Sequence, residues 1–206
     1  MTRRLMNFYG AATVLMAWPW IRVRVVNRSG IVPGQPCLFI SNHQSFADPY
    51  LMGFFPNEFV FISNRWPFHI PLLGFFAKLA GYLNAQQLNP EVFFAEAKKH
   101  LDDGVTLFSF AEGTRTRTGE LGAFHTTAFR LALAMKVPIV PVCIAGAYRI
   151  FPTGNTLLRP GVAHVHALPN IPPQEFEHLT AHQLKQKVRQ IIASQIAVLE
   201  GGIACH

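Results

Sequence analysis

Short apolar runs recur along the chain, separated by polar turns or by helical patterns. The segment from Arg22 to Val26 alternates and is rich in β-branched residues, which is typical of a strand. Five further runs, rich in apolar residues, are predicted to be buried strands. They cover residues 37–41, 58–63, 105–110, 139–145 and 162–168.

Helical patterns lie between these strands. Asn89-Pro90-Glu91 supplies a cap, a proline at the first position and an acid in the first turn, so a helix is predicted from there to near Gly104. Helices are also predicted from Ser45, which stands three residues before Asp48 as in a capping box, and over residues 122–136. Thr180 and Gln183 form a second capping box before an apolar stripe at helical spacing. The stripe consists of Leu184, Val188, Ile191, Ile192 and Leu199.

Strands that alternate with helices predict an α/β fold, layered, with a largely parallel sheet flanked by helices. In such sheets, ligand sites lie beyond the carboxyl ends of the strands. Residues 68–83 are apolar but are broken by Pro71, Gly74 and Gly81, which suits a kinked helix and loop that could line a lipid tunnel.

The N-terminal segment is predicted to be a membrane-associated helix. Arg3 and Arg4 precede an apolar run, residues 5–21, that contains Trp18 and Trp20, and further arginines follow. A spanning helix needs about 20 apolar residues, so this run is at the short limit, and an interfacial helix is preferred. The alternative is a helix packed on the domain. We therefore divide the chain into residues 1–21, the membrane-associated helix, and residues 22–206, one domain.

Composition supports a lipid or membrane surface as a partner. Only 14% of the residues are charged, against about 25% in average soluble domains, and mean hydropathy is +0.23. A compact α/β core with buried strands would explain the same numbers. The formal charge of +7 favours anionic surfaces, but the basic residues are scattered and no nucleic-acid-binding signature is present, so nucleic acid is not expected as a partner.

No cofactor or metal is expected from the sequence. Cys37 and Cys143 lie within apolar runs, have no metal-ligand spacing and are interpreted as reduced core residues. His164 and His166 would share one face of a strand, but a third ligand with fitting spacing is absent, so a packed or exposed pair is preferred to a zinc site.

The segment Asn42-His43-Gln44-Ser45-Phe46-Ala47-Asp48 carries the main candidate chemistry. A carboxylate that holds the imidazole tautomer and stabilises its protonated form makes a histidine a general base. The geometry requires His43 in a loop and Asp48 in the first helical turn. The alternative is a loop histidine beside a helix-capping aspartate.

A second polar cluster, residues 110–115, follows the strand predicted at 105–110. Gly113 allows close backbone approach, Arg115 offers a bidentate fork to phosphate or carboxylate, and Thr114 adds a donor. Glu112 could accept from a substrate hydroxyl or hold Arg115. The alternative is a polar turn with an internal Glu112–Arg115 pair. Together, the two clusters indicate acyl transfer to a hydroxyl or amine.

These motifs resemble those of the glycerolipid acyltransferase family, which includes the 1-acylglycerol-3-phosphate (lysophosphatidate) acyltransferases. The resemblance rests on His-x-x-x-x-Asp within Asn-His-Gln-Ser, followed by Phe-x-Glu-Gly-Thr-Arg, and covers roughly residues 20–150. Residues 137–142, Val-Pro-Ile-Val-Pro-Val, resemble the fourth block of the family.

The resemblance implies a reaction and roles for named residues. His43 would deprotonate the acceptor hydroxyl and Asp48 would orient it, and the hydroxyl would attack the thioester of acyl-CoA or acyl carrier protein directly. The acceptor would be a lysophospholipid, bound by the second motif, and the protein would lie at the cytoplasmic face of the inner (plasma) membrane. The expected substrate-binding residues are Asn42, Ser45, Arg65, Glu112, Gly113, Thr114, Arg115 and His125.

Two departures from the family pattern leave the acceptor open. The block from Gly81 to Gln87 lacks the arginine that the family usually has, and His125 stands where the family often has lysine. Arg65 could compensate. The same chemistry on a phosphate-free acceptor, such as a lyso-aminolipid or another hydroxyl or amine, therefore remains an alternative. A non-catalytic lipid-binding protein is a third interpretation.

Overall fold

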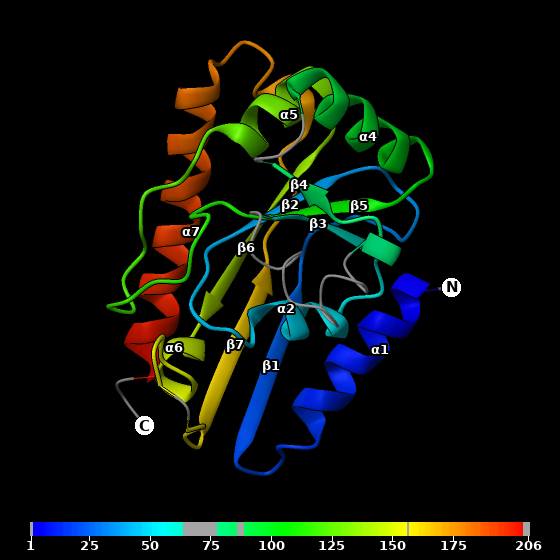
Figure 1. The fold of residues 1–206 in the computed structure, drawn as a ribbon. Helices are drawn as coiled ribbons and strands as arrows, with labels where there is room; N and C mark the ends of the chain where they lie inside the picture. Colours follow the sequence, from blue (N-terminus) through cyan, green and yellow to red (C-terminus); the bar gives the residue numbers. More distant parts are fainter. Residues whose placement is uncertain (1, 64–77, 86–88, 156, 204–206) are drawn as a thin grey trace.

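A single mixed sheet forms the centre of the computed structural model, which describes residues 2–63, 78–85, 89–155 and 157–203. The strand order is β1-β7-β6-β2-β5-β3-β4 (Figure 1). The strands are β1 (Ile21–Asn27), β2 (Leu38–Ser41), β3 (Phe59–Ser63), β4 (Leu83–Asn84), β5 (Thr106–Phe110), β6 (Ile139–Ala145) and β7 (Gly161–Ala167).

Most of the sheet is parallel, as predicted. β6, β2, β5, β3 and β4 run in one direction, whereas β7 is antiparallel to β6 and pairs in parallel with β1. The reversal follows β6, where the chain forms only the one-turn helix α6 (Ala147–Ile150) before it returns as β7. The carboxyl ends of β2, β5 and β6 therefore meet at one edge.

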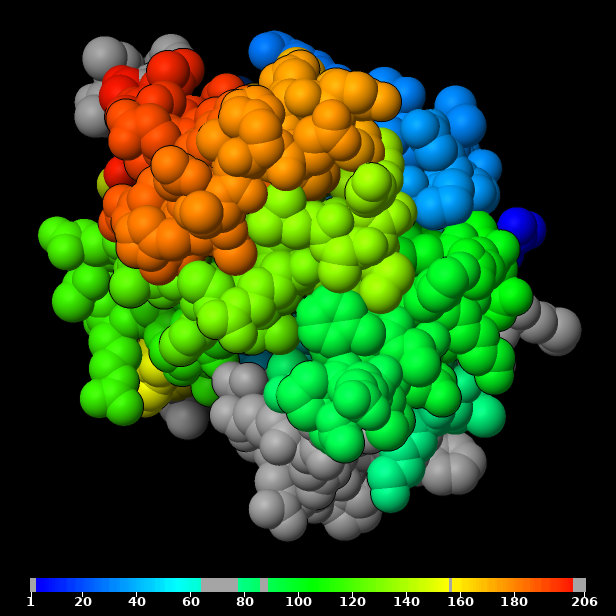
Figure 2. All heavy atoms as spheres, turned by 90° about the horizontal axis from the view of Figure 1, so that it is seen from above, coloured from blue at the N-terminus to red at the C-terminus, as the bar shows by residue number. Residues whose placement is uncertain are grey.

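Helices cover both faces of the sheet. On one side lie α4 (Pro90–Asp102), α5 (Thr127–Met135) and α7 (Ala181–Ile203), and on the other lie α1 (Thr2–Leu15), α2 (Asp48–Leu51), η1 (Met52–Phe54) and α6 (Figure 1). The 3₁₀ turn η3 (Pro173–Glu175) precedes α7. From above, the start of α7 (orange) and α5 (yellow-green) lie side by side (Figure 2).

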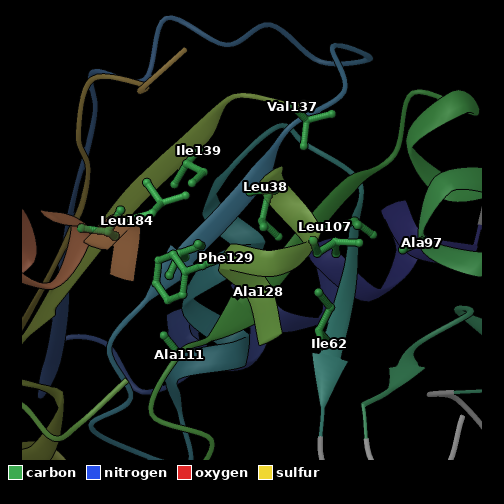
Figure 3. Packing of buried hydrophobic residues seen from close by; sticks show 14 of the residues in the cluster. Leu38, Ile62, Ala97, Leu107, Ala111, Ala128, Phe129, Val137, Ile139 and Leu184 are labelled. Carbon is green, nitrogen blue, oxygen red and sulfur yellow. The ribbon is translucent and has the colours of Figure 1, made fainter. Parts of the chain in front are cut away.

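The core on the α5 side is mainly aliphatic. Leu38 and Leu107 of the sheet pack with Phe129 of α5 and Leu184 of α7, and all four side chains are fully buried (Figure 3). Val188 and Ile192 continue the predicted stripe of α7 and are also fully buried. Burial of this stripe explains why α7 packs along the sheet.

The core on the α2 side is aromatic. Phe39, Phe59, Phe61 and Phe108 make ring contacts with centroids 5.0–6.5 Å apart, mostly tilted or edge to face. Such geometries are favourable for aromatic pairs. This ring cluster extends to the carboxyl edge of the sheet through Phe110 of β5.

The six predicted strands and two predicted helix starts agree with the structure to within one residue, whereas β4 was not predicted. Asn89 caps α4, its side chain accepting from the Glu91 N–H at 3.0 Å. Before α7, the Thr180 hydroxyl accepts from the Gln183 N–H at 3.2 Å, and the Gln183 side chain accepts from the Thr180 N–H at 2.9 Å, which is a reciprocal capping box.

Two predicted helix starts are wrong. Ser45 does not cap α2, which begins at Asp48 without a side-chain cap, because the Ser45 hydroxyl donates to Phe151 O and accepts from Ala47 N–H. The helix predicted from residue 122 begins only at Thr127, because the backbone N–H of His125, which such a helix would bond internally, donates to Ala111 O at 2.7 Å.

The N-terminal helix is shorter than the apolar run. α1 ends at Leu15, and a turn over residues 16–20 leads into β1. α1 packs closely on η1 and α2, since a Cβ on Gly53 would lie 2.6 Å from Ala11 N and one on Gly10 would lie 3.0 Å from Tyr50 O. No helix among the described residues has the length and apolarity that a membrane crossing requires. The kinked helix predicted over residues 68–83 lies largely outside the described residues.

Candidate active site

Both polar motifs lie at the edge formed by the carboxyl ends of β2 and β5. Ser41 at the end of β2 is in register with Phe110 at the end of β5, so the residues that follow them are neighbours. Asn42 fastens the first motif to β6: its side-chain amide donates to Ile144 O and accepts from Ile144 N–H, both at 2.8 Å. The loop is therefore tied to the sheet immediately before His43.

His43 and Asp48 form the expected pair. His43 Nδ1 lies 2.8 Å from Asp48 Oδ2, and the side chains are 14% and 0% exposed. Oδ2 also accepts from the N–H groups of Gln44 at 2.6 Å and Ser45 at 2.8 Å. Asp48 thus begins α2 and folds the motif loop around its own carboxylate.

The hydrogen bonds fix which imidazole nitrogen is available. An ionised carboxylate only accepts hydrogen bonds, so His43 Nδ1 carries the proton in the neutral ring and Nε2 keeps its lone pair. This is the tautomer that a general base needs.

Phe110 covers one side of the imidazole. The rings of His43 and Phe110 stack with centroids 4.0 Å apart and an interplanar angle of 16°. The ring is therefore held between the Asp48 carboxylate at one edge and the aromatic core beneath it.

Glu112 is buried and engaged on both oxygens. Oε1 accepts from the His43 N–H and Oε2 from the Gly122 N–H, each at 2.9 Å. Burial raises the pKa of Glu112 above its ordinary value, and these two amide donors oppose the shift. Within the described residues the expected alternative, an internal ion pair with Arg115, does not form.

The remaining residues of the second motif are more open. Gly113 has φ +67°, a backbone conformation that favours glycine, and Thr114 is exposed. The Arg115 guanidinium lies over the Phe46 ring, with Cζ 5.7 Å from the ring centroid. In the described part of the chain, Arg115 makes no ion pair, which leaves its charge available to an anion.

The other predicted site residues differ in their position. Ser45 is fully buried, and its hydroxyl is hydrogen-bonded to the backbone. The His125 side chain is exposed, and the backbone N–H of this residue donates to Ala111 O at 2.7 Å. Arg65 and Gln87 lie outside the described residues.

Sequence reasoning missed several residues that hold the site together. Thr116 N–H donates to His43 O at 2.9 Å, and Thr153 donates to Thr116 O at 2.7 Å. Tyr148 donates its N–H to the Gln44 side chain at 3.3 Å and its hydroxyl to Arg117 O at 2.7 Å. Of these residues, only Gln44 and Thr116 could have been found from the sequence, because they lie within or directly after the two motifs.

Neither described cysteine has the environment of a nucleophile. Cys37 and Cys143 are free and buried, and burial raises the pKa of the Cys37 thiol to about 11 and that of Cys143 to about 12. No group of three His, Cys, Asp or Glu side chains in the described ranges could hold a metal ion. His164 and His166 lie with ring centroids 6.1 Å apart on β7.

Comparison with known proteins places these motifs in a family. The family model described as Acyltransferase matches residues 22–145, more than half of the 206 residues. The chain belongs to the acyltransferase family. The family assignment expected from the two motifs is confirmed.

Relatives with curated names match this acyltransferase-family chain over part of their length. The chloroplastic 1-acyl-sn-glycerol-3-phosphate acyltransferase BAT2 of Brassica napus is 35% identical over 123 residues, which are 58% of this chain and 36% of that protein. A 1-acyl-sn-glycerol-3-phosphate acyltransferase of Chlamydomonas reinhardtii is 28% identical over 183 residues, 86% of this chain and 54% of that protein. The chain thus covers between 36% and 54% of these two relatives.

One solved structure shares the fold over nearly the whole chain. The 1-acyl-sn-glycerophosphate (LPA) acyltransferase PlsC from Thermotoga maritima aligns with a TM-score of 0.82, covering 96% of this chain and 79% of that one, at 23% identity. The likeness extends beyond the region matched by the family model and therefore includes α7.

Proposed function

We propose that this protein transfers a fatty acyl group from an acyl-CoA or acyl-carrier-protein thioester to the free hydroxyl of a lysophospholipid such as 1-acyl-glycerol-3-phosphate. The observation that carries the proposal is the 2.8 Å contact between His43 Nδ1 and Asp48 Oδ2, which leaves Nε2 as a base at the sheet edge. The names of the curated relatives supply the acceptor class.

The proposed reaction uses this geometry. His43 Nε2 accepts the proton of the acceptor hydroxyl while its oxygen attacks the thioester carbonyl carbon. The buried Asp48 carboxylate stabilises the imidazolium that forms. When the tetrahedral intermediate collapses, the C–S bond breaks, the thiolate leaves and the imidazolium returns the proton to sulfur. An ester and a free thiol result, without a covalent enzyme intermediate.

Arg115 is the proposed phosphate contact in the acceptor site. Its guanidinium can form two charge-assisted hydrogen bonds to one anion, and Thr114 and the Gly113 backbone adjoin it. His125, exposed on the same connection, and Arg65 complete the proposed acceptor site.

Three further predicted site residues have their polar groups engaged with the backbone: Asn42, Ser45 and Glu112. We therefore propose that they hold the loops of the site in place and do not contact the acceptor.

We further propose that residues 1–21 attach the acyltransferase domain, residues 22–206, to the cytoplasmic face of the inner membrane. The observation in favour is a concentration of exposed apolar side chains in this segment, next to Arg4, Arg22 and Arg24. A lysolipid acceptor resides in the bilayer, so attachment would bring the site to its substrate.

The test of catalysis is acyl transfer by His43→Ala. Loss of a general base is expected to lower turnover by a factor on the order of 10² to 10⁴ while the variant stays folded. Purified protein is given acyl-CoA or acyl carrier protein with lysophosphatidate, and product is measured by mass spectrometry. His182→Ala, which removes an exposed histidine of α7, is the matched control and keeps wild-type activity. Activity of His43→Ala above a tenth of wild type contradicts the assignment.

A phosphate-free acceptor is the second candidate, because His125 replaces a family lysine. The same assay with lyso-aminolipids and simple hydroxyls or amines separates the two. Product from lysophosphatidate supports the first proposal, and product only from phosphate-free acceptors supports the second. Lipid binding without turnover on any donor, unchanged in His43→Ala, would instead indicate a lipid-binding protein.

A further inference from the structure

The C-terminal helix touches the connection that follows the second motif. Arg189 of α7 donates from Nε to Gly122 O and from Nη2 to Leu121 O, each at 3.0 Å. In Figure 1 this connection (green) leaves β5 and runs beside α7. α7 lies beyond residues 22–145, the region that the family model matches.

Gly122 carries this contact to Glu112. Its carbonyl is held by Arg189, and its N–H donates to Glu112 Oε2 at 2.9 Å. A Cβ on Gly122 would lie 2.6 Å from the same oxygen, so only glycine fits without moving the carboxylate. The Gly122 residue is therefore fixed on both its amide and its carbonyl side.

Glu112 carries the contact to the candidate base. Its second oxygen accepts from the backbone N–H of His43 at 2.9 Å. Four hydrogen bonds of 2.9–3.0 Å thus join α7 to the residue whose ring faces Asp48. Since Glu112 is buried, water cannot readily replace these partners.

We propose that Arg189 is a positioning residue for His43 and that it acts through Gly122 and Glu112. The proposal rests on the proposed function of His43 as the base. It also assigns Glu112 to the placement of the base, where the family resemblance implies a contact with the acceptor.

The two roles of Glu112 predict different kinetics. A positioning residue affects the transition state more than substrate binding, and small misplacements of reacting groups are costly. Arg189→Gln is therefore expected to lower kcat by a factor on the order of 10 to 10², with the KM of the lysolipid changed less than about threefold. If these residues served acceptor binding instead, Arg189→Gln would raise the KM of the lysolipid.

The matched control is Lys187→Gln. Lys187 also lies on α7 and also ties the helix to a neighbour, with Nζ 3.4 Å from the Glu175 carboxylate, but that contact leads away from His43. The control loses the same charge and keeps wild-type kcat. Arg189→Lys, which retains a donor and the charge, recovers part of the lost turnover, whereas Gly122→Ala reproduces the loss without removing a charge.

A double-mutant cycle tests the route. If Arg189 acts through Glu112, Arg189→Gln adds little to the loss caused by Glu112→Gln. The proposal is overturned if the double variant loses kcat by the product of the two single-variant factors. It is also overturned if Arg189→Gln lowers the melting temperature but keeps wild-type kcat. The second result would make Arg189 a purely structural residue.

A readout without turnover separates this inference from the proposed function. In the NMR spectrum of protein labelled with ¹⁵N-histidine, the backbone amide signal of His43 is the one that is absent from His43→Ala. This signal is expected to shift in Arg189→Gln and not in Lys187→Gln. If it shifts while wild type has no turnover on any acceptor, the acyltransferase proposal fails and the positioning link stands. An unmoved signal contradicts the link.

Discussion

A single carboxylate oxygen organises the loop that carries the candidate base. Asp48 Oδ2 accepts from the His43 ring and from two consecutive backbone amides at 2.6–2.8 Å. Its negative charge therefore determines both the backbone of the loop and the tautomer of the imidazole. Charge-assisted hydrogen bonds of this kind are about twice as strong as neutral ones.

Asp48→Asn is expected to lower turnover by a factor on the order of 10² to 10⁴, because the amide removes the charge that stabilises the imidazolium and can favour the wrong tautomer. The variant should also unfold at lower urea concentration, since two backbone amides lose an ionised acceptor. Steady-state rates and urea titrations check both effects.

The control for this change is Asp103→Asn, an exposed aspartate after α4, which keeps wild-type turnover and stability. An Asp48→Asn variant that retains more than a tenth of wild-type turnover would mean that the carboxylate is only a loop anchor.

Residue roles were predictable where partners are close in sequence. His43 and Asp48 are five positions apart, so their contact could be expected from the motif alone. The partners of Glu112 are 69 and 10 residues away, and the sequence gives no sign that both of its oxygens bind backbone amides. From sequence alone, Glu112 is therefore predicted to contact substrate, whereas both of its oxygens bind backbone N–H groups.

At the scale of elements, α1 and α4 meet through a buried histidine. Arg3 of α1 donates from Nε to Ala80 O at 3.0 Å, and its Nη2 lies 3.4 Å from His100 Nδ1 of α4. Burial lowers the pKa of His100 below its ordinary value, and the Arg3 charge adds to this shift, against smaller opposing effects of the Gly81 backbone, Glu96 and Asp103.

This contact predicts a loss of stability in mild acid. Because the pKa of His100 is lower in the folded protein, the unfolded chain binds the proton more readily as pH falls through about 6.5. The free energy of unfolding is therefore highest above that pH and decreases below it. One histidine contributes at most about 1.4 kcal/mol per pH unit. Urea unfolding at pH 7.5, 6.5 and 5.5 measures the slope.

His100→Gln is expected to reduce this slope without abolishing it, because burial also lowers the pKa values of His164 and His166. His178→Gln, which changes an exposed histidine, is the matched control for the substitution itself. Equal slopes in wild type and His100→Gln would show that the α1–α4 contact does not titrate.

Elements were predicted best where burial is complete. The strand at residues 139–145 has the bounds expected from its apolar run, and every residue in it is buried. The starts of α2 and α5 differ from the predicted ones because the Ser45 hydroxyl donates to Phe151 O and the His125 backbone N–H donates to Ala111 O, so neither group serves a helix. Local propensity thus yields to tertiary contacts beside the site.

At the scale of the whole molecule, exposed apolar side chains gather at the N-terminal end. Seven of the fourteen large apolar residues that the described structure exposes lie within the first 20 positions. They are Leu5, Phe8, Tyr9, Leu15, Met16, Trp18 and Trp20. The opposite side of α1 is closed against η1 and α2, so the helix is amphipathic in its contacts.

Replacement of Trp18 and Trp20 together by Ala is expected to weaken binding to vesicles that contain anionic lipid by at least about tenfold, since each indole is 66% exposed and would be buried in the interface. Sedimentation with vesicles measures the partition coefficient. Val198→Ala, which trims a 69% exposed side chain of α7, serves as the control. Unchanged partition of the double variant would contradict membrane attachment through this segment.

The overall architecture was predictable and its exceptions were not. Alternating strands and helices imply a parallel sheet, and five of the strands comply. β7 runs antiparallel to β6 and pairs in parallel with β1. These pairings depend on which edge of the sheet is free, and local sequence patterns do not contain that information.

The stack of Phe110 on His43 makes the aromatic core part of the surroundings of the candidate base. From Phe59 through Phe108 to Phe110, ring centroids lie 5.6 and 4.8 Å apart, and the last step to the imidazole is 4.0 Å. Close-packed interiors transmit displacement from one side chain to the next. Under the proposed function, a substitution at these phenylalanines that conserves packing volume would therefore still displace the imidazole and change turnover as well as stability.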